Sequence, residues 1–180
     1  MSDKKKKTVV IYKGKYGATE QYARWIAEEL QCDIFDADHF LARDFGKYDN
    51  IIFGGALQAG GIKGFELIRK NRMKILEKKT VIFAVGLNTD SQENRIQVRE
   101  INFNKYALSG MTLYYCKGAF DPEKVKGMDR AIINLTLNML KKKPESQWTE
   151  DERRLYHDMT EGADYIDKKY IEPIVAEFRD

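Results

Sequence analysis

The chain has 180 residues, of which 43% are apolar and 33% are charged, and its formal net charge is +3. This length supports about one domain with one substantial core, and the apolar fraction excludes a disordered chain. No apolar run approaches the roughly 18 to 20 residues that a membrane-spanning helix needs. No apolar stretch of signal-peptide length follows the first lysines, so we expect a cytoplasmic protein.

The basic excess comes mainly from Lys4 to Lys7, because the rest of the chain has 27 basic and 28 acidic side chains. We predict a flexible basic tail over residues 1–7 and a single domain over residues 8–180. The four lysines have no aromatic or basic companions at helical spacing, which disfavours nucleic-acid binding. The two cysteines form no CxxC pair and the two histidines stand apart, so the pattern does not indicate a metal site.

Short continuous runs of β-branched and aromatic residues predict strands at residues 8–12, 51–54, 81–85 and 113–116, and a weaker run predicts an edge strand at 33–36. Such runs are typical of a parallel sheet with helices on both faces. Between the runs, periodic apolar residues predict helices over 19–30, 64–76, 91–103 and 123–142. This alternation predicts an α/β doubly wound, five-stranded parallel sheet.

The helix predicted over 123–142 has an apolar face made of Met128, Ile132, Leu135 and Met139. We expect this face to cover the sheet; peripheral contact with a membrane surface stays open as the alternative, because three lysines follow the helix. Residues 147–180 have too few large apolar groups for a core of their own. We therefore expect them to form a helical C-terminal tail that packs on the sheet.

Ligands of open α/β sheets bind where the strands end, so the loops that follow the predicted strands form the candidate site. The first loop (residues 13–19) runs into a helix, whose unpaired N–H groups and dipole favour a phosphate. The second loop (residues 54–61) has four glycines, which let a backbone approach a ligand closely. The third loop (residues 86–91) and the fourth loop (residues 117–121) would complete one crevice.

These elements, with the Tyr16-Gly17-Ala18-Thr19 turn, the glycine-rich second loop and the Val85-Gly86-Leu87-Asn88 segment, resemble a flavodoxin domain over residues 8–178. Within that family the likeness is greatest to menaquinone-dependent protoporphyrinogen oxidases, on the Gly118-Ala119 turn, the Asp129-Arg130 pair and the apolar helix ending near Met139-Leu140. The resemblance implies the strand order 2-1-3-4-5, which places Cys32 and Cys116 on opposite edges, beyond disulfide reach.

The resemblance also implies the cofactor FMN, with its phosphate at the first loop and its ring between the second and third loops. The implied FMN-binding residues are Lys13, Gly14, Lys15, Tyr16, Gly17, Ala18, Thr19, Ala56, Leu57, Gln58, Ala59, Gly60, Gly61, Gly86, Leu87, Asn88, Thr89, Lys117 and Gly118. The chain departs from shuttle flavodoxins because Thr19 is the only aliphatic hydroxyl of the first loop. In addition, the second and third loops contain no aromatic residue.

Positive charge near reduced flavin stabilises its anion, and we expect such charge from Lys13, Lys15, Lys63 and Lys117. This expectation favours an oxidoreductase with two-electron chemistry, similar to the quinone-linked protoporphyrinogen oxidases, whose redox partner is a quinone or a porphyrinogen. An electron carrier between redox proteins is the alternative, and a domain that has lost FMN is a third. No side chain is predicted to act as a catalytic acid, base or nucleophile, and the sequence does not give the oligomeric state.

Overall fold

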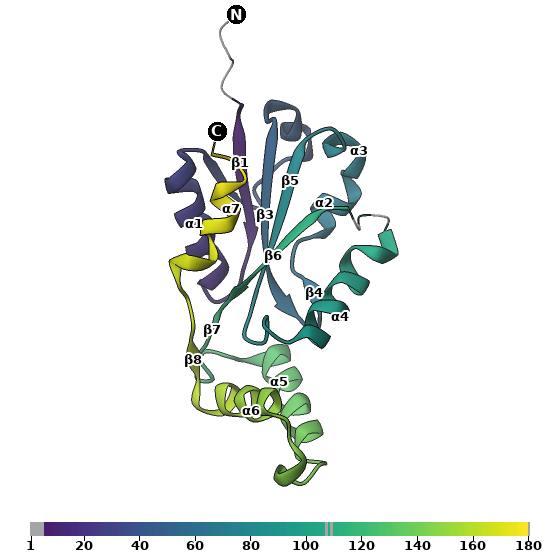
Figure 1. The fold of residues 1–180 in the computed structure, drawn as a ribbon, viewed down its shortest axis with the longest axis vertical. Coiled ribbons are helices and arrows are strands. Elements are labelled where there is room, and N and C mark those ends of the chain that lie inside the picture. Colours follow the sequence, from purple (N-terminus) through teal and green to yellow (C-terminus); the bar gives the residue numbers. More distant parts are fainter. Residues whose placement is uncertain (1–5, 107, 109, 180) are drawn as a thin grey trace, which may run out of the picture.

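The computed structural model describes residues 6–106, 108 and 110–179. Residues 1–5 of the predicted basic tail lie outside the described residues. The parallel strands pair in the order β2, β1, β3, β5 and β6 (Figure 1). Their bounds are Asp33–Asp36 for β2, Thr8–Lys13 for β1, Asn50–Gln58 for β3, Lys79–Gly86 for β5 and Thr112–Lys117 for β6. Counted along the chain, these main strands have the predicted order 2-1-3-4-5, which is confirmed.

Helices cover both faces of this sheet (Figure 1). One face carries α1 (Ala18–Leu30) and α7 (Glu172–Ala176), and the other carries α2 (Glu66–Lys70), α3 (Arg72–Ile75) and α4 (Gln92–Asn102). Short 3-10 helices lie at Ala42–Lys47, Asn104–Tyr106, Glu145–Gln147 and Lys168–Tyr170. Among the residues that the structure describes, no helix is long and apolar enough to cross a membrane.

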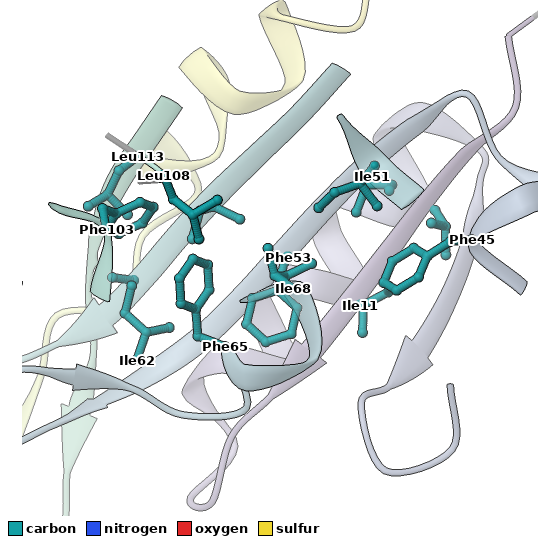
Figure 2. Close-up of a cluster of buried hydrophobic side chains, with 14 of the residues drawn as sticks. Ile11, Phe45, Ile51, Phe53, Ile62, Phe65, Ile68, Phe103, Leu108 and Leu113 are labelled. Carbon is teal, nitrogen blue, oxygen red and sulfur yellow. The ribbon is translucent and has the colours of Figure 1, made fainter. Parts of the chain in front are cut away.

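The sheet separates two hydrophobic cores. Along β1, Val9 and Ile11 enter one core and Val10 enters the other, and all three are fully buried. Figure 2 shows the first core, where Phe53 of β3 packs near Phe65 at the start of α2. Each buried large apolar side chain contributes about 1.5–3 kcal/mol, and the central strands β1, β3 and β5 bury such side chains on both faces. This burial on both faces explains why the strands read as continuous apolar runs.

Strand β3 extends to Gln58, so the expectation of a loop over residues 54–61 is wrong for most of that segment. A Cβ atom on Gly54 would lie 1.9 Å from Cζ of Phe83, and one on Gly55 would lie 2.3 Å from Cγ2 of Ile62. Neighbouring side chains of the protein itself therefore occupy the space that these glycines leave free.

The turn that follows β3 is a two-residue hairpin. Ala59 and Gly60 both have left-handed backbone angles, with φ of 48° and 80°, and they join Gln58 to its partner Gly61. Such a pair is typical of a type I′ turn. It connects β3 to the short antiparallel strand β4 (Gly61–Ile62).

The predicted helix over 64–76 is divided between α2 and α3 at Asn71. The Nδ2 of Asn71 donates to the carbonyl of Leu67 at 2.8 Å, which is the local side-chain bond that competes with helix continuation. The helix predicted over 123–142 begins later than expected, as α5 (Gly127–Leu140).

The expectation that the apolar face of α5 covers the sheet is wrong. Helix α5 and helix α6 (Glu150–Glu161) form a hairpin beyond the carboxyl ends of the strands (Figure 1). The antiparallel strands β7 (Ala119–Phe120) and β8 (Ala163–Asp164) pair at the base of this hairpin. The sheet face beside α1 is instead covered by α7 and its neighbours, with Ile171, Ile174 and Val175 buried in the second core.

Of the expected tail over 147–180, only the part around α7 packs on the sheet, because α6 pairs with α5. Trp148 closes the connection between these two helices: its Nε1 donates to the carbonyl of Lys143 at 3.1 Å, and its ring lies 5.0 Å from that of Tyr156. Cys32 and Cys116 are both free thiols, as the strand order predicts.

The variant Gly54→Ala is expected to lower the free energy of unfolding by about 1–3 kcal/mol, because its Cβ overlaps the Phe83 ring and overpacks the core. The control Gly46→Ala has open space and should change stability by no more than about 1 kcal/mol, in the stabilising direction. Urea denaturation followed by circular dichroism measures both. Equal stability of the two variants would contradict the packing role of Gly54.

Candidate functional site

The first loop leaves the amino terminus of α1 without a side-chain cap. Gly17 is the N-cap residue, with φ of 100°, and within the described residues this helix start has no side-chain cap hydrogen bond. A Cβ on Gly14 would lie 3.0 Å from Cβ of Thr19, so glycine lets the loop fold closely over the start of the helix. Open N–H groups at the positive end of a helix dipole favour a bound anion.

Next to this helix start lies a cavity of about 760 Å³, within the range of roughly 300–1,000 Å³ typical of cofactor and ligand sites. It lies between the ends of the parallel strands and the α5–α6 hairpin. The predicted site residues that line it are Lys15, Tyr16, Ala18, Thr19, Ala56, Leu57, Gln58, Ala59, Gly60, Gly86, Leu87, Asn88 and Gly118. The tertiary structure therefore brings all four predicted loops to one cavity.

The other predicted site residues do not line this cavity: Lys13, Gly14, Gly17, Gly61, Thr89 and Lys117. Gly14 instead packs closely against Thr19, and Gly17 forms the N-cap of α1. Thr89 is buried, with 2% of its surface exposed.

The expected cationic crevice is wrong, because carboxylates pair with three of its four lysines. Lys13 contacts Asp36 and Asp38, Lys15 contacts Asp129, and the Nζ of Lys117 lies 2.8 Å from a carboxylate oxygen of Asp90. Within the described part of the chain, Lys63 forms no ion pair, although it lines the cavity. The hydrogen bond from Lys13 lowers the pKa of Asp38, so the two charges persist together at neutral pH.

Asp129 joins α5 to the first two loops. Its carboxylate accepts hydrogen bonds from Nζ of Lys15, from the hydroxyl of Tyr16 and, at 3.0 Å, from Nε2 of Gln58. The bond from Lys15, followed by that from Tyr16, lowers the pKa of Asp129 below its ordinary value of 3.8. Three donors from two loops thus hold one turn of α5 over the cavity.

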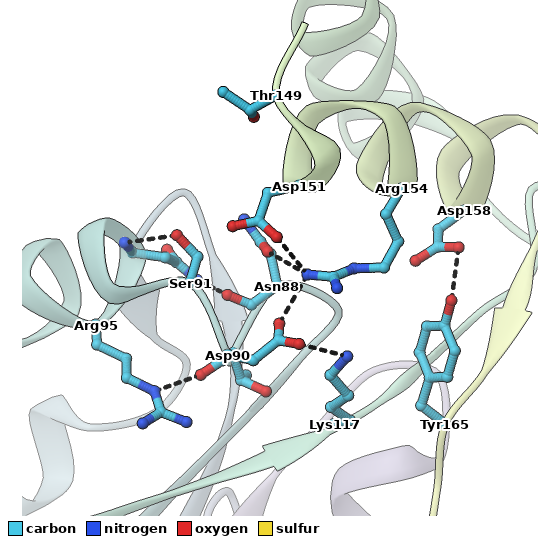
Figure 3. Close-up of polar contacts among 12 residues, drawn as sticks. Asn88, Asp90, Ser91, Arg95, Lys117, Thr149, Asp151, Arg154, Asp158 and Tyr165 are labelled. Atoms are coloured by element: carbon cyan, nitrogen blue, oxygen red, sulfur yellow. Dashed lines mark hydrogen bonds and ion pairs between the residues drawn. The ribbon is translucent and has the colours of Figure 1, made fainter.

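Arg154 holds α6 over the third loop (Figure 3). One guanidinium nitrogen lies 3.0 Å from Asp90, 2.9 Å from Asp151 and 3.4 Å from Oδ1 of Asn88. Burial raises the pKa of Asp90, but the hydrogen bond from Lys117 and the charge of Arg154 outweigh it, so this pKa is lowered overall. The network fixes the second helix of the hairpin to the ends of β5 and β6.

Several residues that line the cavity were not among the predicted FMN-binding residues, and those of α5 were missed because α5 was assigned to the sheet. Lys63 was expected only as a nearby positive charge, and Ser91, Ala119 and Phe120 lie in the predicted third and fourth loops. The others are Val85, Glu93, Asn94, Gln97, Val125, Asp129, Ile132, Ile133, Thr136, Leu155 and Met159. The signal that could have found the hairpin wall is a second apolar row on α5, at Ile133, Leu137 and Leu140. An apolar row outside the stripe assigned to the sheet indicates a further packing contact of the helix.

Aromatic side chains reach the cavity from segments other than the second and third loops. Tyr16 of the first loop and Phe120 of β7 both line it. The expected absence of aromatic walls therefore applies to the second and third loops only. Among the described residues, no group of three His, Cys, Asp or Glu side chains is close enough to hold a metal ion.

The contact between Lys15 and Asp129 predicts a pH dependence. Because the pKa of Asp129 is lowered in the fold, the contact stabilises the hairpin above the ordinary range of aspartate and is lost as the pH falls through the lowered value. Carbon-detected NMR of the carboxyl groups should show the pKa of Asp129 rising in Lys15→Met but unchanged in the matched control Lys13→Met, which should raise that of Asp38 instead. An Asp129 titration insensitive to Lys15→Met would contradict the assigned contact.

Comparison with known proteins gives a match to the family described as flavodoxin domain, over residues 9–147. No curated protein matches the chain in sequence. Among solved structures, flavodoxin 2 from Bacillus cereus is 15% identical with a TM-score of 0.47, and the match covers 85% of this chain and 94% of that one.

A flavoprotein in complex with FMN from Lactobacillus acidophilus is 15% identical, with a TM-score of 0.41 and coverage of 62% and 92%. The flavodiiron core from Synechocystis is 18% identical, with a TM-score of 0.43. The match covers 64% of this chain but only 30% of the length of that core. Likenesses this low carry no argument of their own. The family match spans more than half of the chain and agrees with the strand order, so the chain belongs to the flavodoxin domain family.

Proposed function

We propose that the protein binds FMN in the 760 Å³ cavity and carries electrons between redox partners. The observation that supports this most directly is the uncapped start of α1, which opens at one end of the cavity. A phosphate monoester would accept hydrogen bonds from the N–H groups of that first turn.

The residues of the first loop fit a phosphate in two further ways. The Thr19 side chain lines the cavity, and its hydroxyl has no hydrogen-bond partner within the described residues, so it is available to a ligand oxygen. Lys15 also lines the cavity and is 46% exposed at its side chain, which leaves it able to turn from Asp129 to an anion.

The flavin ring would lie between the end of β3 and the third loop. Leu57 and Gln58 line one side of this space, and Leu87 and Asn88 line the other. When bound, FMN supplies the capacity to take up and release electrons, and the chain supplies binding, orientation and control of access.

Two observations favour an electron carrier over an enzyme. The family match is to flavodoxin domains, and three of the four lysines on which the expectation of two-electron chemistry depended are paired with Asp36, Asp38, Asp90 or Asp129. No side chain is assigned as a catalytic acid, base or nucleophile.

A second candidate function has one observation in its favour. The cavity extends under the hairpin, where Ile133, Leu155 and Met159 provide an apolar wall that a flavin phosphate site does not require. Such a wall suits an organic substrate beside the flavin, such as the quinone or porphyrinogen that the oxidase resemblance implies. Under this candidate the protein would be an FMN-dependent oxidoreductase.

Apoprotein titrated with FMN should quench the flavin fluorescence, and riboflavin, which has no phosphate, should bind at least about tenfold more weakly. Thr19→Val should weaken FMN binding but not riboflavin binding, because it removes one hydroxyl at the proposed phosphate site. The matched control is Thr112→Val, which lies at the amino-terminal end of β6, whereas the cavity lies at the carboxyl ends of the strands. Absence of FMN binding at millimolar concentration would sink the proposal and support a domain that has lost FMN.

Redox titration of the FMN-loaded protein separates the carrier from the enzyme. Reduction in two resolved one-electron steps is expected for the carrier, because partners in such chains exchange single electrons. A single two-electron step, together with turnover of a quinone or porphyrinogen above that of free FMN, would overturn the carrier proposal in favour of the second candidate. Absorbance during stepwise reduction measures the number of electrons in each step.

A further inference from the structure

Helix α5 presents a continuous apolar stripe that nothing in the described structure covers. Met128, Ile132, Leu135 and Met139 have 80%, 37%, 62% and 60% of their surface exposed. At about 3.6 residues per turn, these four side chains fall within an arc of roughly 60°. The stripe therefore runs along nearly the whole helix, and an exposed apolar surface of this kind marks an interaction site.

This stripe is distinct from the wall of the 760 Å³ cavity. Met128, Leu135 and Met139 do not line the cavity, and only Ile132 belongs to both surfaces. Helix α6 packs against another side of α5. The stripe consequently lies on the outside of the hairpin, next to the cavity mouth.

Positive charge is concentrated at both ends of the stripe. Residues 122–143 contain six basic and two acidic side chains, whereas residues 144–164, which include α6, contain two basic and seven acidic ones. Lys124 and Lys126 precede the first turn of α5, and Lys141 begins a run of three lysines after its last turn. Lys124 pairs with Asp121 and Lys143 pairs with Glu152, so the lysines without an ion pair among the described residues are Lys126, Lys141 and Lys142. Of the two acidic residues in 122–143, Asp129 forms an ion pair with Lys15.

We propose that the stripe and its flanking lysines dock the protein on an anionic lipid bilayer. An apolar helical face with lysines beside it is the pattern of helices that lie in the membrane interface, and clustered lysines are attracted to anionic headgroups. Because α5 belongs to a hairpin that projects beyond the sheet (Figure 1), a flat surface can reach it.

The composition of the stripe favours lipid over a protein partner. Protein interfaces are enriched in aromatic residues, methionine and arginine and depleted in lysine, so the lack of aromatic residues and the lysines, not the methionines, separate this stripe from such interfaces. The stripe has only methionine, isoleucine and leucine, and its rim is rich in lysine. Because Ile132 lies on both surfaces, docking in this way places the mouth of the 760 Å³ cavity at the bilayer.

Flotation with vesicles tests this proposal on the full chain, with or without FMN, so its outcome is independent of cofactor binding. The protein should float with vesicles of phosphatidylcholine containing about one third phosphatidylglycerol and not with phosphatidylcholine alone. The double variant Leu135→Gln/Met139→Gln should lower the partition coefficient about tenfold or more, since it removes two membrane-facing apolar groups. Lys126→Glu/Lys142→Glu should also lower it, and added salt should weaken binding of the wild type.

The matched control is Met73→Gln/Leu76→Gln. Met73 lies in α3 and Leu76 directly follows it, and each is 73% exposed. This control should bind vesicles like the wild type, and circular dichroism should show all variants folded. Failure of the wild type to float with anionic vesicles would overturn the proposal. So would an equal loss in the control, or a dimer in light scattering that Leu135→Gln/Met139→Gln abolishes while vesicle binding is absent.

Discussion

The parallel pairing of the strands is the constraint on which the rest of the structure depends. Lys13 of β1 pairs with Gly55 of β3, and Gly86 of β5 pairs with Lys117 of β6. Parallel strands need a crossover after each one, so their carboxyl ends meet at the same edge and their connecting segments start there. The uncapped start of α1, the β3–β4 hairpin and the third and fourth loops meet around one cavity for this reason.

The second half of the cavity has a different physical origin. No residue of α5 is fully buried, and the hairpin is held to the sheet edge by polar contacts of Asp129 and Arg154. Partly exposed ion pairs contribute much less than core packing. The hairpin therefore depends on polar contacts and partial burial, whereas the sheet depends on its two buried cores. The cavity lies between these two differently stabilised walls.

Charge near the cavity depends on pairs that form between distant segments. The lysines of the first loop are paired with Asp36 at the end of the edge strand β2, with Asp38 just after it, and with Asp129 of α5. Counting charges along the sequence does not reveal this, because Lys15 and Asp129 are 114 positions apart. The potential at a bound cofactor is consequently set by the fold and not by local composition.

The sequence by itself determined the elements whose signals are local. The apolar runs gave the main strands, the periodicity gave α1 and α4, and the turn before Thr19 indicated the open helix start. Sequence reasoning placed residues 54–58 in a loop and α5 on the sheet, because the deciding contacts are made by remote residues. Phe83 and Ile62 fill the space beside Gly54 and Gly55, and α7 covers the sheet beside α1, whereas α5 lies beyond the strand ends. Only the tertiary structure decides which partner buries an apolar face, since a periodic pattern specifies that a face exists and not what packs against it.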